Sequence, residues 1–369
     1  MKIALLVPGG VDRSGEHRVV PALLALIKRL ALQHDVHVYA LRQEPVPDHW
    51  RLHGANVHNI GGAGVATEFR ALAAILRESR VEPFDVIHAI WSGAGGLVAV
   101  AAAKLLRVPS VVHMAGGELI ALPAIGYGGR LTWKGRLREA LVLRGASAVT
   151  AASDPVIAQL AALGRKGRRV PLGVDLQTWP PRDPVCRDVK LPVRLIHIAS
   201  LNRVKDQATL LRALALLAAK GIAFHLDVAG EDTLGGSIQT LARHLGLAQL
   251  VSFHGFMTQR QLRPLLEQAH MNLISSLHEA GPLVVLEAAV LGVPSVGTAV
   301  GHLSEWAPEA ALAVAVGDSA SLAAVVERLI EDEDLRFALA AQAKRRALLH
   351  DADHTATMFQ ALYAELTGR

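Results

Sequence analysis

Short apolar runs alternate with stretches of helical periodicity along almost the entire chain. The runs Lys2–Val7, Phe84–Ala89 and Val108–His113 have the length and composition of buried strands. Between such runs lie stretches like Val19–Leu32, whose apolar residues recur at helical spacing. Strands and helices that alternate with short connections form a parallel, doubly wound α/β sheet. Ligands of such sheets bind outside the carboxyl ends of the strands, so the loops that follow the strands are the candidate site regions.

The chain is too long for one such sheet. Its 369 residues exceed what a single hydrophobic core usually serves, so two domains are expected. A stretch rich in proline and charge interrupts the pattern, and we predict an interdomain linker at 179–192. It separates a Rossmann-like domain at 1–178 from a second one at 193–350. The remaining residues, 351–369, form a terminal helix.

The most informative stretch lies in the second half of the chain. Met271–Ser275 is typical of a buried strand, Pro282 suits the start of a helix, and Gly292 stops that helix. The helix N-terminus offers free N–H groups and a partial positive charge, which suit a phosphate group. Glu279 lies in the preceding loop and Glu287 lies inside the helix. Carboxylates at these two places suit a sugar ring and a ribose diol.

The two glutamates are separated by seven residues in the pattern S-x3-E-x-G-P-x4-E-A-x3-G-x-P, with Gly301 and Glu305 following. This pattern resembles the donor-binding signature of the retaining family-4 glycosyltransferases. The resemblance spans nearly the whole chain. It implies the GT-B fold, in which two doubly wound Rossmann-like domains face each other across a cleft. It also implies that the terminal helix packs back onto the N-terminal domain.

The loop after the first strand of the second half matches the family in part. The family pattern there is G-R-L-x3-K-G, and Lys205 occupies the lysine position. Ser200 occupies the arginine position, and Arg203 follows three residues later. Arginine and lysine at the end of a strand hold a diphosphate by charge-assisted hydrogen bonds. The sequence leaves open whether Arg203 substitutes for the family arginine.

Two features of the first half are candidates for the acceptor side. Gly10 and Gly15 follow the first strand, and we consider them as an acceptor or phosphate loop, with a plain tight turn as the alternative. His113 ends a strand at a place where the family has a histidine that contacts the transferred sugar. The alternative for His113 is a hydrogen-bonded core side chain.

The resemblance implies a role for each of these residues. We predict His113, Glu279 and Lys205 as the catalytic residues. The predicted donor-binding residues are Arg203, Lys205, Gly281, Leu283, Val284 and Glu287. In this scheme the cations and the N–H groups hold the diphosphate, Glu287 binds the ribose and Glu279 orients the donor sugar.

The implied activity is transfer of a hexosyl or other sugar from a nucleoside diphosphate sugar to an acceptor hydroxyl, with retention of the anomeric configuration. The expected acceptor is a lipid-linked or polysaccharide precursor of the cell envelope. No cofactor and no metal is expected, because Asp332-x-Asp334 and Asp351-x-Asp353 lie among helical charges. The alternatives are a GT-B nucleotide-sugar epimerase or hydrolase and a non-catalytic nucleotide-sugar-binding protein. The base, the sugar, the acceptor, the linkage and the oligomeric state stay open.

Composition indicates which classes of partner the protein binds and in which compartment it is expected. The net charge is +5, but aromatic residues make up only 4%, which is too few for base stacking, so no nucleic acid is expected. Gly129–Arg144 has five basic residues and one acidic residue, with Trp133 and leucines between them. It suits an anionic membrane surface, a solvated helix face or an acceptor groove. The single cysteine, Cys186, fits a reducing compartment, so we expect a cytoplasmic or inner-face peripheral protein.

Overall fold

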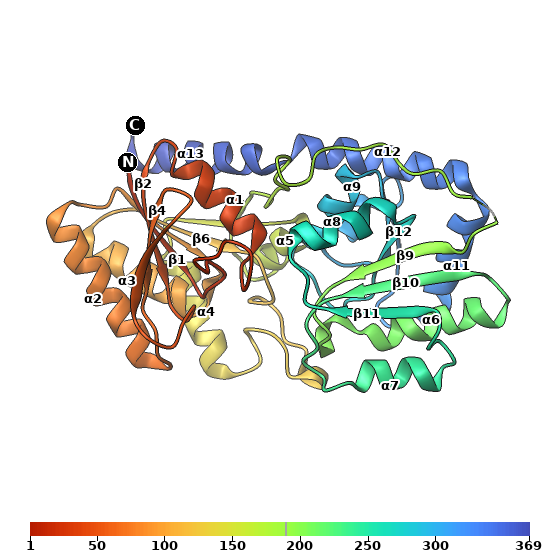
Figure 1. Cartoon of the computed structure of the whole chain (residues 1–369). Coiled ribbons are helices and arrows are strands. Elements are labelled where there is room, and N and C mark those ends of the chain that lie inside the picture. The colour runs from red at the N-terminus through yellow and green to blue at the C-terminus, as the bar shows by residue number, and fades with distance from the viewer. Residues whose placement is uncertain (189) are drawn as a thin grey trace. The chain divides into compact units, whose positions relative to one another are not determined.

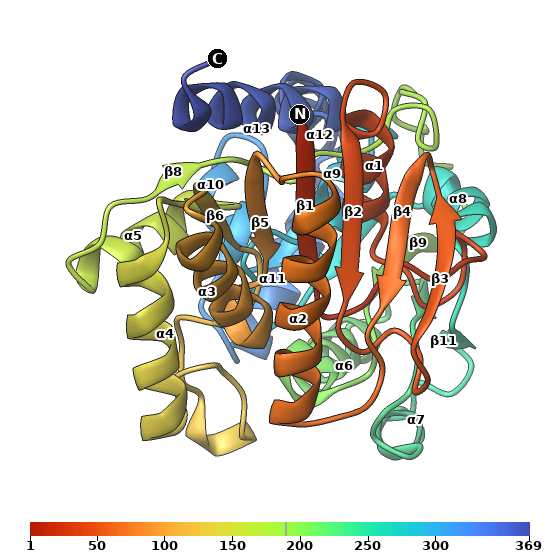
Figure 2. The same ribbon diagram turned by 90° about the vertical axis from the view of Figure 1, so that its left-hand side faces the viewer.

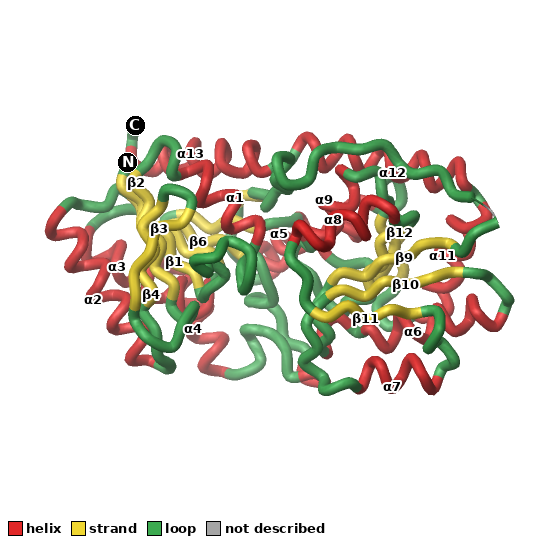
Figure 3. Tube along the Cα trace, in the orientation of Figure 1, coloured by secondary structure: helices red, strands yellow, loops and turns green. Residues whose placement is uncertain are grey.

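The computed structural model describes residues 1–188 and 190–369 and divides into two compact units (Figure 1). Unit 1 comprises Met1–Gly173 and Ala352–Arg369, and unit 2 comprises Val174–Asp351. Each unit contains one sheet flanked by helices, as the yellow and red segments of Figure 3 show. The chain therefore passes from unit 1 to unit 2 after Gly173 and returns after Asp351.

The described part of the segment predicted as an interdomain linker, 179–192, is grouped with unit 2, which begins at Val174. The N–H of Arg182 donates to the carbonyl of Val290 over 2.9 Å. The guanidinium of Arg336 donates to the carbonyl of Val185 over 2.7 Å. Prolines keep this segment out of helices and sheets, but its backbone groups still bond to the unit. Residue 189 of the predicted linker lies outside the described residues.

Unit 1 is built on a sheet that, within the described residues, has eight strands in the order β3-β4-β2-β1-β5-β6-β7-β8. Its strands are β1 (Lys2–Val7), β2 (Asp35–Ala40), β3 (Asp48–Leu52), β4 (Ala55–Asn59), β5 (Val86–Ile90), β6 (Ser110–Met114), β7 (Ala148–Ala151) and β8 (Arg168–Arg169). Neighbouring strands are parallel, except that β3 pairs antiparallel with β4. The central strands are buried along their whole length, which explains their uninterrupted apolar runs.

The helices of unit 1 cover both faces of this sheet. They are α1 (Pro21–Leu30), α2 (Val65–Val81), α3 (Leu97–Leu106), α4 (Trp133–Gly145), α5 (Asp154–Ala162) and α13 (Ala352–Thr367). Figure 2 shows α2, α3 and α4 in front of the sheet and α1 behind it, and α1 packs against α13. Phe359 and Tyr363 of α13 are buried in the same core as β1 and β5. The C-terminal helix is therefore an integral part of unit 1.

Unit 2 has six strands within its described residues, in the order β11-β10-β9-β12-β13-β14, and all neighbours are parallel. The strands are β9 (Val193–Ile198), β10 (Phe224–Ala229), β11 (Val251–Gly255), β12 (Met271–Ile274), β13 (Ser295–Thr298) and β14 (Leu312–Val314). The helices are α6 (Gln207–Ala219), α7 (Ser237–His244), α8 (Gln259–Gln268), α9 (Leu283–Val290), α10 (Gly301–Trp306), α11 (Ser319–Glu331) and α12 (Glu333–Leu349). α6 packs with α11, and α9 packs with α12. No helix among the described residues has the length and apolar character needed to cross a membrane.

The strand order places one topological switch point in each unit. In unit 2, β9 and β12 are neighbours in the sheet, but the chain passes through β10 and β11 on one side of β9 before it forms β12 on the other side. The strand order therefore reverses between β9 and β12. In unit 1 it reverses between β1 and β5. Ligands of open parallel sheets bind outside the carboxyl ends of the strands at such a point. The loops that follow β9 and β12 are therefore the place in unit 2 where a ligand is expected.

Candidate functional site

The loops that follow β9 and β12 are bonded to each other. The hydroxyl of Ser275 donates to the carbonyl of Lys205 over 2.7 Å, and the N–H of Leu277 donates to the carbonyl of Val204 over 2.7 Å. The side chain of Asn202 accepts from the N–H groups of Val204 and Lys205, at 3.1 and 3.2 Å. These bonds hold the backbone of Lys205 in a short 3₁₀ turn at the switch point.

Lys205 and Glu279 meet at this point. The Nζ of Lys205 lies 2.5 Å from Oε1 of Glu279, and the hydroxyl of Ser276 donates to the same oxygen over 2.6 Å. The side chain of Lys205 is 24% exposed and that of Glu279 is 13% exposed, so both can still be reached by a ligand. Arg203 is exposed in the same turn and has no ion pair within residues 1–188 and 190–369. The structure thus brings three of the predicted site residues into one loop pair.

The start of α9 is open to a ligand. Pro282 has an extended conformation and is the N-cap residue of α9, whereas the sequence pattern predicts it as the first residue inside the helix. No side chain caps this end, so the first N–H groups of the helix stay available. The residues predicted to offer N–H groups to a phosphate are Gly281, Leu283 and Val284, all partly exposed.

Gly301 explains how the loop before α9 can pack so closely. Its φ is +47°, in the left-handed region that favours glycine. A Cβ at this position would lie 2.8 Å from Cδ of Pro282 and 3.2 Å from Cβ of Glu279. Glycine is therefore required for the start of α10 to support the loop that carries Glu279.

Glu287 lies on the buried side of α9. Only 6% of the residue is exposed, and its Oε1 accepts a hydrogen bond from the amide of Gln259 over 3.0 Å. Burial raises the pKa of its carboxyl to about 7, although the Gln259 amide opposes the shift. A carboxyl that titrates near neutrality is a strong acceptor for hydroxyl groups once it is ionised. Sequence analysis missed Gln259, because no local pattern links the start of α8 to α9.

His113 has the environment of a hydrogen-bonded core side chain, which is the alternative that the sequence left open. It lies in β6, is fully buried, and hydrogen-bonds through Nδ1 to the hydroxyl of Thr150 over 2.9 Å. Its ring packs edge-on against Phe359 of α13, and burial lowers its pKa to about 3. The ring is therefore neutral and beneath the surface. No atom of the ring is exposed, and Nε2 is buried without a hydrogen-bond partner among the described residues, so the contact with a sugar stays a prediction.

The loop that carries Gly10 and Gly15 is organised around Asp12. Gly10 and Gly15 both have positive φ, and the Asp12 carboxylate accepts from the N–H of Ser14 and from the guanidinium of Arg18. Burial opposes ionisation, but these bonds lower the pKa of Asp12 to about 2. The guanidinium of Arg18 lies 2.7 Å from the Asp12 carboxylate and neutralises its charge. An acceptor loop, a phosphate loop and a plain tight turn therefore all stay predictions for Gly10 and Gly15.

A pair of buried acids in unit 1 was not found by sequence analysis. The hydroxyl of Ser92, just after β5, donates to Glu139 of α4 over 2.8 Å, and Glu139 is 3% exposed. The N–H of Gly116 donates to the Glu118 carboxylate over 2.8 Å. Burial and the neighbouring Glu118 raise the pKa of Glu139 to about 7. Glu139 lies among basic residues in the sequence, so it resembles an ordinary surface charge.

The described residues contain no group of side chains that could bind a metal ion. Among them, no three histidine, cysteine, aspartate or glutamate side chains are grouped to hold an ion. One aspartate of each Asp-x-Asp pattern has a structural partner. Asp332 caps α12 through the N–H of Leu335, and Asp353 pairs with Arg29.

Two protein-family models match this chain, one in each half. The model of the family "Glycosyl transferases group 1" matches residues 190–346. The model "Glycosyl transferase 4-like domain" matches residues 19–174. The first match contains the β9 and β12 loops described above, and the second covers most of unit 1 outside α13.

Individual relatives extend over most of the chain. A D-inositol 3-phosphate glycosyltransferase of Frankia alni is 31% identical over 74% of this chain and 73% of its own length. EpsF of Bacillus subtilis is 28% identical over 80% of this chain and 78% of its own. Among solved structures, Anabaena HepE with UDP and glucose has a TM-score of 0.78 at 19% identity, covering 99% of this chain and all of HepE. A sucrose-phosphate synthase of Thermosynechococcus elongatus has a TM-score of 0.80 at 17% identity, covering both chains completely. These structures share the fold.

Proposed function

The chain belongs to the group 1 glycosyl transferases with a 4-like N-terminal domain and the GT-B fold, and from this premise we propose that it transfers a sugar to an acceptor hydroxyl with retention of the anomeric configuration. The donor is a nucleoside diphosphate sugar. HepE, which has the same fold, was crystallised with UDP and with UDP-glucose. The acceptor that we propose is a glycan or lipid-linked precursor of a cell-envelope polysaccharide.

The observation that carries this proposal is the meeting of Lys205 and Glu279 at the switch point of unit 2. The two side chains come from different loops and lie beside the uncapped start of α9. A cation and free N–H groups suit a diphosphate, and a carboxylate suits sugar hydroxyls. Glu287, further along α9, supplies a second acceptor for the ribose.

The proposed chemistry follows from where charge develops. As the bond to the sugar breaks, negative charge grows on the departing diphosphate, and Lys205 and Arg203 stabilise it together with the N–H groups at the start of α9. The departing phosphate accepts the proton of the acceptor hydroxyl, which enters on the same face of the sugar. These groups neutralise the leaving group without a metal ion, so we propose that none is required.

Glu279 orients the sugar in this scheme and does not attack it. Its Oε1 is already shared by the ammonium of Lys205 and the hydroxyl of Ser276. Both contacts draw electron density from the carboxylate and weaken it as a nucleophile. A covalent intermediate on Glu279 is therefore the less favoured route.

A donor and acceptor screen tests the function. Purified protein is incubated with UDP-, GDP- and ADP-sugars, with and without candidate acceptors that include inositol 3-phosphate, and release of the nucleoside diphosphate is followed. Release that depends on an acceptor supports a transferase. Release without an acceptor indicates a hydrolase, an isomerised donor indicates an epimerase, and donor binding without turnover indicates a binding protein. Each of the last three outcomes contradicts the proposal.

Two further measurements test the finer points. The proton coupling at the new anomeric centre, read by NMR, distinguishes retention from inversion. Turnover in the presence of EDTA, with and without added magnesium or manganese, tests metal independence. Loss of activity in EDTA that magnesium restores would overturn the metal-free mechanism but not the transferase assignment.

We also propose that α4 rests on an anionic membrane surface. Trp133, Leu137 and Leu141 recur at helical spacing and are 63%, 52% and 49% exposed, so they form an apolar stripe that faces solvent. The basic residues of the segment are Arg130, Lys134, Arg136, Arg138 and Arg144. The one acid, Glu139, is buried, so the solvent-facing charge of α4 is entirely positive. An apolar stripe flanked by cations is the pattern of an interfacial helix.

Vesicle binding tests this surface. Wild type is expected to sediment with phosphatidylglycerol vesicles and not with pure phosphatidylcholine vesicles. Leu137→Glu places a negative charge in the stripe and is expected to abolish sedimentation, whereas Leu105→Glu, at an exposed leucine of α3, keeps it. Equal sedimentation of the two variants would contradict the proposal.

A further inference from the structure

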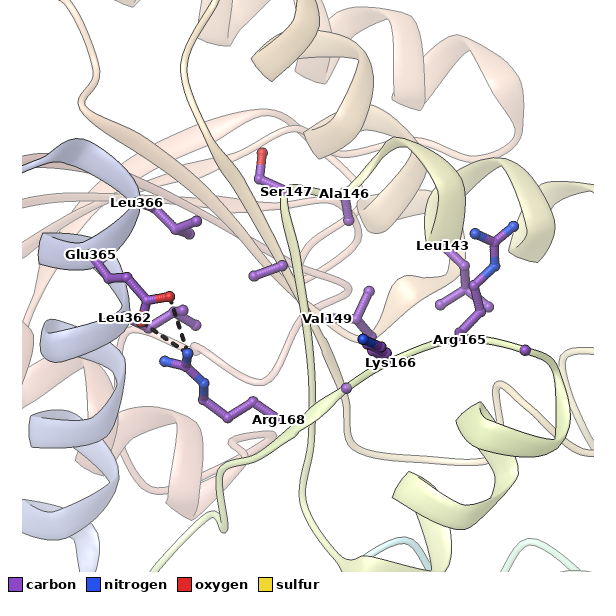
Figure 4. A pocket seen from close by; sticks show the side chains of 13 residues that line it. Leu143, Ala146, Ser147, Val149, Arg165, Lys166, Arg168, Leu362, Glu365 and Leu366 are labelled. Carbon is purple, nitrogen blue, oxygen red and sulfur yellow. Dashed lines mark hydrogen bonds and ion pairs between the residues drawn. The ribbon is translucent and has the colours of Figure 1, made fainter.

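A pocket of about 540 Å³ lies at the amino-end edge of the unit 1 sheet, away from the carboxyl ends where the proposed substrates bind (Figure 4). Its walls come from the end of α4, the start of β7, the loop between α5 and β8, and the last turns of α13. This volume is within the range of sites that take small ligands. All of its walls belong to unit 1.

The charge of the pocket is strongly positive. Arg165 and Lys166 of the α5–β8 loop and Arg168 of β8 line it, and Glu365 of α13 is the one acid among the lining residues. Figure 4 shows that the guanidinium of Arg168 forms an ion pair with the carboxylate of Glu365, with 2.9 Å between Nη2 and Oε2. Arg165 and Lys166 form no ion pair with any residue that the structure describes. Two positive charges therefore remain without a counter-charge.

The backbone presents these two cations in a defined way. Gly164 ends α5 with a φ of +67°, and its N–H donates to the carbonyl of Ala161 over 2.9 Å. The N–H of Arg165 donates to the carbonyl of Leu160 over 2.9 Å. These two bonds are those of a Schellman motif, which fixes the residues just past the helix end. Arg165 and Lys166 therefore start from an ordered backbone.

The remaining lining groups are one hydroxyl and apolar side chains. The hydroxyl of Ser147 accepts from the N–H of Ser110 over 3.1 Å, and Figure 4 shows it pointing away from Arg165 and Lys166. Leu143, Leu362 and Leu366 provide apolar walls beside the cations. An arginine fork and an ammonium beside apolar surface suit a phosphate group attached to a less polar body.

We propose that this pocket binds a phosphorylated ligand through Arg165 and Lys166. Such a phosphate can come from a lipid headgroup or from a soluble phosphomonoester. The site is distinct from the proposed diphosphate clamp at Lys205, and it does not depend on that assignment.

Binding of sn-glycerol 3-phosphate, followed by titration calorimetry, tests the site. The double variant R165Q/K166Q is compared with wild type and with R77Q/R80Q, which removes the same charge from exposed arginines of α2. Lys205→Ala serves as a second control, because it alters the proposed clamp alone. We expect R165Q/K166Q to bind at least about tenfold more weakly, as the loss of charge-assisted bonds implies, and both controls to bind as wild type does.

Vesicle sedimentation with phosphatidylglycerol distinguishes the two sources. A matching loss of vesicle binding in R165Q/K166Q assigns the phosphate to a lipid headgroup, and unchanged vesicle binding assigns it to a soluble ligand. The two cations could also serve only the dipole at the end of α5. In that case R165Q/K166Q melts at a lower temperature but binds both probes as wild type does, and this result would overturn the proposal. A loss shared equally with R77Q/R80Q would overturn it too.

Discussion

The ammonium of Lys205 lies 2.5 Å from the carboxylate of Glu279 in this structure, and the two residues are proposed to bind adjacent parts of the donor, the diphosphate and the sugar. When the diphosphate binds Lys205, it breaks the ion pair between Lys205 and Glu279. In the complete donor, the sugar hydroxyls then donate hydrogen bonds to the Glu279 carboxylate in place of the ammonium. A nucleoside diphosphate without the sugar binds Lys205 but leaves the Glu279 carboxylate without a new partner. The pair therefore favours the donor over the spent product.

Removing the charge of Glu279 should reverse this preference. In Glu279→Gln, Lys205 loses its counter-charge, so we expect nucleoside diphosphate to bind several-fold more tightly, on the order of 1 kcal/mol for a partly exposed pair. Turnover should fall, because the sugar loses its acceptor. Titration calorimetry with UDP, GDP and ADP measures the affinity. Glu309→Gln, which loosens an exposed pair with Arg346, is the control and should bind as wild type does. Equal affinities of wild type and Glu279→Gln would refute the competition.

Lys205→Ala should lower kcat by about 10²-fold or more, which is the usual effect of losing one group that stabilises a leaving charge. Lys220→Ala is a matched control. Lys220 also lies 2.5 Å from a glutamate, Glu327, but it is 56% exposed and lies at the far end of α6. Initial rates with the donor found in the screen provide the measurement. An unchanged rate in Lys205→Ala would remove this residue from the site.

Donor binding should depend on the ionisation of Glu287. Its pKa of about 7 means that affinity rises with pH through neutrality, as the carboxylate gains acceptor strength for the ribose hydroxyls. We expect Glu287→Gln to bind the donor about tenfold more weakly and to lose this pH dependence. Titrations on both sides of pH 7 measure it. The control, Glu331→Gln, changes an exposed acid at the end of α11. A Glu287→Gln curve that follows wild type would contradict the ribose role.

Because of Glu139, unit 1 should become less stable as the pH rises from about 4.5 to about 7. Its pKa is about 7 in the fold against 4.5 for an ordinary glutamate, so between these values the native chain binds more protons than the unfolded chain. The free energy of unfolding therefore falls as pH rises across this window. The shift corresponds to about 3 kcal/mol at most. Glu139→Gln can still accept from Ser92 and removes the titration. It should match wild type at low pH and exceed its melting temperature above pH 7; parallel pH profiles would argue against this.

Local pattern was enough to predict the central strands and most helices. Lys2–Val7 and Met271–Ser275 are buried and consist mostly of apolar residues, and a single sequence displays such runs directly. The edge strand β3 (Asp48–Leu52) was missed, because one side of an edge strand meets solvent and its residues are mixed. The composition of the proline-rich segment at 179–192 predicts an interdomain linker without regular structure, but composition does not report its backbone bonds to distant helices.

For the site, sequence alone determined which residue types follow the strands of unit 2, because the motif around Glu279 is contiguous and its helix start is a local feature. Only the tertiary structure decided their partners. It paired Lys205 with Glu279 and Glu287 with Gln259, and it buried His113 under Phe359 of α13. The physical reason is that burial and ion pairing arise between residues far apart in the chain. Periodicity reports only on neighbours within a few turns.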